Sequence, residues 1–404
     1  MQDDLVRLAA FAGLLSAMVI YIAAGGALQR AESSLAGGTQ SAAVFFVPSI
    51  TLAKINSDYQ KQVRILIVPG HQPDTGGTEY NGVYERDVVV DIASALADLL
   101  ARNPHYDVMV ARGKTAWNPV LQSYFDTHTA DITAFLASQK LQMAQHIADG
   151  RLLVEPNQVY HNTTPLPAAL QLYGINKWTS ENNIGITLHL HINDYARRTR
   201  AGKYDGFAVY VPDRQYSNAE VSKAIGTAIA ARLSPYHATS TLPREDVGVV
   251  EDQELIAIGS NNTADGASIL IEYGYIYEPQ FQKSRVRPLA VADYAYATYL
   301  GLQDFFKDPV PTTFGSVSFP YDWSQVRIVD GASGPGVYAL QSALRYLGYY
   351  PPAGKDFSDC PVSGIAGSCT IAAVGVYQKL RGLEVTSTLG PKTRAALESD
   401  LAAP

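Results

Sequence analysis

Apolar residues along the middle of the chain recur with two different periods, which predicts alternating strands and helices. Short β-branched or alternating runs at Ile65–Val68, Ile184–Asn193 and Ala267–Tyr277 predict buried strands. Between Val88 and Leu99 the apolar residues recur at helical spacing, which predicts an amphipathic helix. This alternation continues to about Lys307 and indicates an α/β domain.

The remaining segments have other patterns. Small and polar residues dominate the stretch before the α/β region, and Pro, Ser, Thr and Gly are frequent after it. We therefore expect a transmembrane or signal segment at 1–30, a stalk at 31–62, the α/β domain at 63–307, a linker at 308–330 and a second domain at 331–404.

The N-terminal segment carries no charged residue from Leu8 to Leu28. A helix of this length would cross a hydrocarbon core of about 30 Å. The small residues at Gly25–Ala27 also suit a cleavage site, so an anchor and a cleaved signal both remain open. Either one places the rest of the chain outside the cytoplasm, in the periplasm or cell envelope, and the anchor would make the membrane a partner.

Composition excludes several other classes of protein. The 404 residues are 47% apolar, which is ample for a large core, and the net charge of -7 without a dense Lys/Arg block argues against a nucleic-acid partner. The chain has no P-loop, no GxGxxG after a strand and no CxxC. Cys360 and Cys369 would close a short loop in an oxidising compartment, or are two unrelated buried thiols.

Residues able to bind a metal stand at the ends of the predicted strands. His71 follows the first strand, at the edge where open α/β sheets bind ligands, and Glu85 opens the following helix. His189 and His191 share one face of the second strand, and Glu272 interrupts the third, where a carboxylate is costly to bury unless it is paired, metal-linked or protonated. Taken singly, these residues also fit a loop histidine, a helix-dipole carboxylate and a salt-bridged strand end.

In this order the motifs resemble those of the zinc-dependent N-acetylmuramoyl-L-alanine amidases: P-G-H, a glutamate that opens a helix, S-x-H-x-N and E-x-G-[FY]. The resemblance covers roughly Val63 to Lys307. It implies a mixed sheet flanked by helices, a Zn²⁺ ion held by His71, Glu85 and a second histidine, and Glu272 as the general base. The implied reaction is hydrolysis of the peptidoglycan amide between the lactyl group of N-acetylmuramic acid and L-alanine of the stem peptide.

The second histidine ligand depends on the alignment chosen. Placing S-x-H-x-N on Thr187–His191 selects His189, whereas keeping the H-x-N triplet selects His191 together with Asn193. We favour His191 as the third metal ligand, because only that register keeps the asparagine. His189 then stands next to the ligands or on the substrate side.

The C-terminal segment resembles the small three-helix peptidoglycan-binding domains. Gly334–Tyr349, Thr370–Leu383 and Gly390–Leu397 follow the order of their three motifs, and the loop 356–369 replaces a shorter turn. The resemblance implies a domain that holds the enzyme on its polymeric substrate.

Two other functions compete with this interpretation. A zinc peptidase acting within the stem peptide would use the same chemistry, and a non-catalytic wall-binding protein could keep the fold. The other five histidines lie in polar or turn-like surroundings, and we expect them on the surface: His105, His128, His146, His161 and His237.

Overall fold

The computed structural model describes residues 46–156, 158–194, 201–234, 237–308, 323, 326, 328–355 and 359–402. The expected membrane-targeting segment at 1–30 lies outside these residues. Within these ranges no helix has the length and apolar character needed to cross a membrane.

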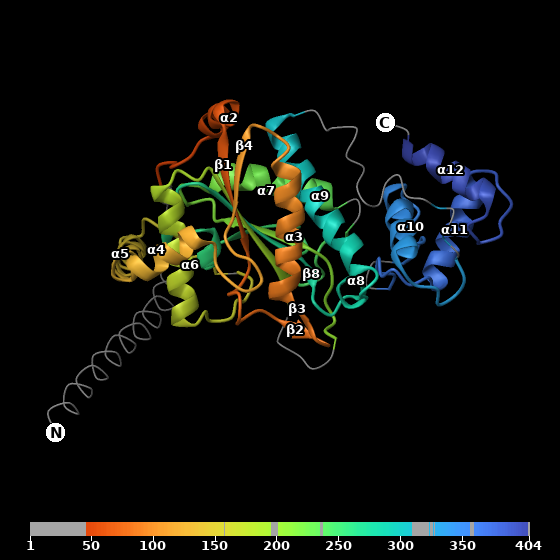
Figure 1. Ribbon diagram of the computed structural model, residues 1–404, viewed down its shortest axis with the longest axis horizontal. Coiled ribbons are helices and arrows are strands. Elements are labelled where there is room, and N and C mark those ends of the chain that lie inside the picture. Colours follow the sequence, from red (N-terminus) through yellow and green to blue (C-terminus); the bar gives the residue numbers. More distant parts are fainter. Residues whose placement is uncertain are drawn as a thin grey trace, which may run out of the picture. The chain divides into compact units, whose positions relative to one another are not determined.

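A six-stranded mixed sheet forms the centre of the α/β region (Figure 1). Its order is β4-β1-β5-β8-β6-β7, with the first four strands parallel and β6 antiparallel to β8. The strands are β1 (Val63–Pro69), β4 (Tyr106–Val110), β5 (Ile186–Asn193), β6 (Ala208–Pro212), β7 (Val249–Asp252) and β8 (Ala267–Tyr275). The predicted mixed α/β class is therefore confirmed.

Helices cover both faces of the sheet, which explains why its strands are apolar on both sides. Ile65 and Ile67 of β1 belong to the core formed with α3, α7 and α9, whereas Leu66 and Val68 belong to a second core under α4 and α6. The helices of the first face are α3 (Glu85–Leu100), α7 (Ala219–Leu233) and α9 (Arg287–Phe306). Those of the second side are α4 (Pro119–Thr127), α5 (Thr129–Ala148) and α6 (Leu166–Glu181).

Short elements connect these layers. The hairpin of β2 (Glu79–Tyr80) and β3 (Val83–Tyr84) leads directly into α3, so the first residue of that helix is fixed by the hairpin. Before and after β8 lie η2 (Ile256–Ile258), η3 (Ser260–Asn262) and α8 (Pro279–Gln282).

The end of the expected stalk is part of the folded α/β region. Residues Leu52–Lys61 form helix α2, whose N-terminus is capped by the Thr51 side chain accepting a hydrogen bond from the Lys54 N–H at 3.1 Å. Ile55 and Tyr59 are buried in the main core. The sequence pattern suggested a stalk because this helix presents many polar residues and only a narrow apolar stripe.

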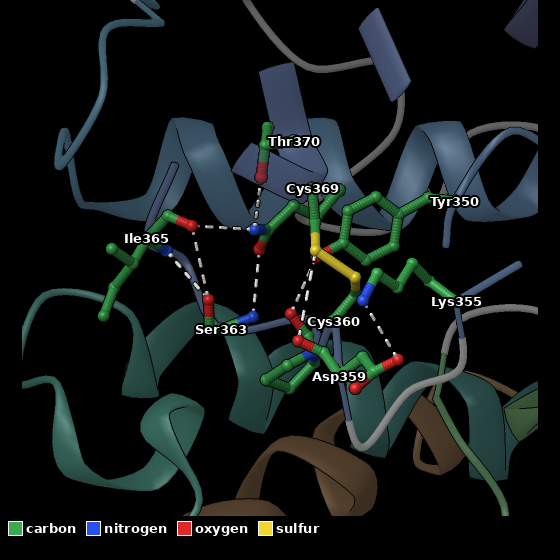
Figure 2. The surroundings of a disulfide bond; sticks show 10 residues. Tyr350, Lys355, Asp359, Cys360, Ser363, Ile365, Cys369 and Thr370 are labelled. Atoms are coloured by element: carbon green, nitrogen blue, oxygen red, sulfur yellow. Dashed lines mark hydrogen bonds and ion pairs between the residues drawn. A yellow bond between two sulfur atoms is a disulfide. The ribbon is translucent and has the colours of Figure 1, made fainter. Parts of the chain in front are cut away.

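The C-terminal region contains three helices among its described residues, α10 (Pro335–Tyr346), α11 (Ser368–Leu380) and α12 (Pro391–Ala402), as the resemblance implied. Buried Gln341 ties α10 to the loop before α11: its Nε2 donates to Ile365 O and Thr370 Oγ1, and its Oε1 accepts from Ser363 N. Figure 2 shows these partners beside the disulfide that joins Cys360 and Cys369.

The C-terminal helices also contact the α/β region. Arg345 of α10 donates hydrogen bonds to the carbonyl oxygens of Ser234 and His237, at 2.8 and 2.6 Å. His237 is itself 6% exposed, so its expected place on the surface was wrong. Trp323 is fully buried, although the predicted linker includes it.

We expect Ile55→Ala to lower the free energy of unfolding by about 2 to 5 kcal/mol, because it leaves a cavity in a packed core. Leu52→Ala is the matched control on the same helix, since Leu52 is 37% exposed, and we expect it to change stability by less than about 0.5 kcal/mol. Denaturant unfolding measures both variants. Equal, small effects would mean that this segment is a loose stalk.

Candidate metal centre

The carboxyl ends of three neighbouring strands bring the candidate residues together. His71 follows β1, His191 lies near the end of β5, and Glu272 lies opposite His191 on β8 in the strand register. Residues paired directly across a sheet point to the same face. The histidine ring and the Glu272 carboxylate therefore share one side of this edge.

His71, Glu85 and His191 form a compact cluster. Their potential ligand atoms all lie within 4.8 Å of one another. The nearest approaches are from Glu85 Oε1 to His71 Nε2, at 2.8 Å, and to His191 Nδ1, at 3.1 Å. Nε2 of His71 is buried without an aligned hydrogen-bond partner among the described residues, so its lone pair or proton is directed elsewhere.

This donor set fits a zinc ion. Catalytic zinc takes three protein ligands, commonly two imidazoles and a carboxylate, and keeps one position open. The cluster offers two imidazole nitrogens and a carboxylate oxygen, and it lies on the wall of a cavity of about 470 Å³.

The Glu85 carboxylate is fixed by backbone groups as well as by the histidines. It is 3% exposed, and it accepts hydrogen bonds from Thr78 N at 2.9 Å and Ile192 N at 3.1 Å. Burial by itself raises the pKa of Glu85, but the charges and hydrogen bonds of His71 and His191 outweigh it and hold the pKa well below its ordinary value. Glu85 is therefore an anion at neutral pH, as a metal ligand must be.

The backbone around His71 is shaped for close approach. His71 itself has a φ of 68°, which is uncommon for a residue other than glycine. A methyl group at Gly70 would overlap the His191 ring, and one at Gly77 would lie 2.9 Å from Cδ2 of His71. Both glycines therefore leave room for the two imidazole rings.

Buried Arg112 holds the backbone just before His71 in place. It is 2% exposed, and it donates hydrogen bonds from Nε to Pro69 O at 3.1 Å and from its terminal nitrogen to Gly70 O and Arg86 O. Burial lowers the pKa of Arg112 to about 10, so it stays charged at neutral pH. Sequence reasoning missed this residue, because an arginine after a strand gives no sign of which carbonyl groups it will meet.

Glu272 lies in the same cavity but outside the cluster. Its Oε2 is buried and has no hydrogen-bond partner in the described part of the chain. Burial raises the pKa of Glu272 well above its ordinary value, and the negative charges of Glu85 and Glu245 add to this. Glu272 therefore binds a proton far more readily than Glu85 does.

The cavity wall also contains His161 and Glu245, which the sequence motifs did not indicate, beside Asn193 of the H-x-N triplet. His161 Nε2 lies 2.7 Å from the Oδ2 of buried Asp252, so this histidine is part of the cavity wall and its expected surface role was wrong. Asn193 donates to Glu245 Oε1 at 3.0 Å. His161 and Glu245 come from loops, where no periodicity marks them.

His189 lies apart from the cluster. It is 1% exposed, and neither ring nitrogen has a hydrogen-bond partner among the described residues. Burial, with a smaller effect of His191, lowers the pKa of His189 to about 3, so its ring is neutral. The structure thus brings His71, Glu85 and His191 together and leaves His189 beside them.

Comparisons with known proteins follow the same division of the chain. Residues 65–304 match the family model of N-acetylmuramoyl-L-alanine amidase, and residues 333–397 match the model of a peptidoglycan binding domain. No curated protein gives a significant match.

Several solved structures are similar to this chain at low identity. The CwlD amidase from Clostridioides difficile, solved in complex with the GerS lipoprotein, has 16% identity and a TM-score of 0.40, over 61% of this chain and 99% of that one. The amidase Ami1 from Mycobacterium abscessus has 14% identity and a TM-score of 0.40, over 60% and 98%. The catalytic domain of CwlV from Bacillus (Paenibacillus) polymyxa has 13% identity and a TM-score of 0.38, over 61% and 100%.

The cluster predicts which substitutions remove a bound metal. His71→Ala, Glu85→Ala and His191→Ala should each lose zinc under mild chelation, because each removes one of three protein ligands. His189→Ala should keep the metal, with an affinity lowered by at most about 10- to 100-fold. The zinc content of the purified variants decides which histidine is the third ligand. If His189→Ala loses zinc and His191→Ala retains it, the ligand is His189 and not His191.

Proposed function

The chain belongs to the N-acetylmuramoyl-L-alanine amidase family, whose model spans residues 65–304, and we propose that its cluster of His71, Glu85 and His191 carries out the family's reaction with one zinc ion. The reaction is hydrolysis of the amide between the lactyl group of N-acetylmuramic acid and L-alanine of the stem peptide in peptidoglycan. The observation that carries the zinc proposal is the convergence of three ligand atoms within 4.8 Å at the wall of a large cavity.

The protein's own groups divide the work. The ring nitrogens of His71 and His191 and the carboxylate of Glu85 would hold the ion, and the backbone N–H groups of Thr78 and Ile192 keep that carboxylate in place. A bound zinc ion would polarise the amide carbonyl and lower the pKa of a bound water to about 7.

Glu272 is the proton carrier in this proposal. Its Oε2 accepts the proton that the attacking water gives up and passes it to the nitrogen of the leaving L-alanine, so that the peptide departs as an amine. The absence of a hydrogen-bond partner at Oε2 within the described residues leaves this oxygen available.

In this proposal the C-terminal helices bind the peptidoglycan polymer. Residues 333–397 match a peptidoglycan binding domain, and attachment to the polymer raises the local concentration of the substrate amide. Because the substrate is cell-wall peptidoglycan, the enzyme acts outside the cytoplasm. We further propose that the uncharged segment Leu8–Leu28 delivers it there, as a membrane anchor or as a cleaved signal.

Replacing Glu272 tests the division between metal ligand and proton carrier. Glu272→Gln should keep zinc near wild-type content and lower kcat by about 10²- to 10⁴-fold, because removing a general base has this effect. Glu398→Gln, at an exposed position on α12, is the control and should change neither quantity. Loss of zinc together with activity in Glu272→Gln would place Glu272 among the ligands instead.

The products of digestion test the reaction itself. Mass spectrometry of digested peptidoglycan should show stem peptides with a free L-alanine N-terminus and muramic acid without peptide. A zinc peptidase would leave a peptide stub on the muramic acid, and a non-catalytic wall-binding protein would release nothing. Either of these results would contradict the proposed function.

A further inference from the structure

A second cavity of about 190 Å³ adjoins the metal centre. His71, His191 and Leu255 line both this cavity and the larger one, so the two cavities lie on either side of the same residues of the cluster. Most of its wall is apolar and comes from the sheet, α6 and η2. The apolar side chains of this wall include Val68, Ile175, Ile256 and Leu270, with Trp117 from the loop before α4.

Buried His189 is a polar group on this wall that lacks a partner. It is 1% exposed, lines the second cavity, and has no hydrogen-bond partner at Nδ1 or Nε2 among the described residues. A buried polar atom without a partner is unfavourable, and most such atoms in proteins have one. The cavity is much larger than the roughly 10–15 Å³ that one water molecule needs. Its size and its unused imidazole therefore point to a ligand group.

The wall also indicates the charge of that group. None of the described residues that line the second cavity is Asp, Glu, Lys or Arg. Its other polar side chains include Gln72 and Gln171, whose amides bond to each other at 2.7 Å. Apart from the imidazoles of the metal cluster, the described wall offers no group to pair with a charge, so a charged group away from the metal would be desolvated without a counter-charge. The cavity therefore suits an uncharged group that combines a small apolar part with one donor and one acceptor.

We propose that this second cavity binds the acetamido group of the muramic acid whose lactyl amide is cut. This inference rests on the proposed function and deepens it. The acetamido group is uncharged, its methyl suits the apolar wall, and its C=O or its N–H can pair with one ring nitrogen of His189. The group and the lactyl ether leave neighbouring carbons of the sugar ring, so an amide at the metal centre places the acetamido group at the adjoining space.

Other parts of the same substrate fit this cavity less well. The methyl of L-alanine has no polar atom to offer His189. The carboxylates further along the stem peptide would enter a wall without any charged side chain among its described residues. In the register that places His191 in the cluster, His189 stands where the family signature S-x-H-x-N has serine, so the ring is a feature of this chain.

Two matched ligands test the proposal: a soluble N-acetylmuramoyl dipeptide and its N-deacetylated counterpart. For the wild-type enzyme we expect kcat/KM to be about 10- to 100-fold higher with the acetylated ligand, since the cavity would otherwise keep its polar group unpaired. Calorimetric titration of the inactive Glu272→Gln protein should give the same order of preference in Kd, independent of turnover.

Two variants connect the preference to the cavity. Ala168→Phe should fill the space from α6, and His189→Leu should remove the polar atoms; both should retain zinc and lose most of the preference for the acetylated ligand. Ala130→Phe, at an exposed position on α5, is the control and should keep the wild-type preference.

The outcomes separate the two proposals. Cleavage of both dipeptides with equal kcat/KM, or an unchanged preference in Ala168→Phe and His189→Leu, would overturn the acetamido site and leave the amidase function intact. Cleavage of neither dipeptide by the zinc-loaded wild-type enzyme would overturn the proposed function and the site with it. If the wild type prefers the acetylated dipeptide and both variants lose this preference, the result would support the acetamido site.

Discussion

The buried carboxylate of Glu85 is the constraint on which the rest of the centre depends. At 3% exposure it is stable as an anion only because positive or donating groups surround it. The β2–β3 hairpin fixes it at the first turn of α3, where the helix dipole favours a negative charge. Two histidines then approach the same oxygen, and Gly70 and Gly77 leave the space that their rings need. Arg112 holds the intervening loop by its carbonyl oxygens.

The same arrangement gives two carboxylates of one cavity opposite properties. His71 and His191 hold the pKa of Glu85 below its ordinary value, against the effect of burial. Glu272 has burial but no such histidine partners, and the charges of Glu85 and Glu245 raise its pKa further. Where the surroundings give two neighbouring carboxyl groups different pKa values, the two groups typically take different roles in catalysis. An ionised carboxylate and a proton-binding neighbour are the pair that the proposed metal-assisted hydrolysis would require.

Much of this was predictable from the sequence, because strand ends and helix starts carry local signals. The apolar runs located β1, β5 and β8, and topology alone brings their carboxyl ends to one edge, so His71, Glu85 and Glu272 were found. The periodic pattern does not show whether His189 or His191 is the metal ligand, since both side chains point to one face of β5. Side chains from distant loops, such as His161 and Glu245, reach the cavity only through the tertiary fold and leave no periodic pattern in the sequence. Helix α2 was missed because its buried stripe is only a few residues wide.

The central proposal is that Glu85 and the two histidines would together hold one metal ion, and titration of the metal-free protein with Co²⁺ tests it most directly. Cobalt(II) occupies zinc sites and absorbs visible light strongly only in a tetrahedral environment. The account predicts saturation at one equivalent with an intense tetrahedral spectrum, and loss of that spectrum in Glu85→Gln, which keeps the shape of the side chain but removes its charge. A weak, octahedral or unsaturable signal in the wild type, or an unchanged spectrum in Glu85→Gln, would contradict it.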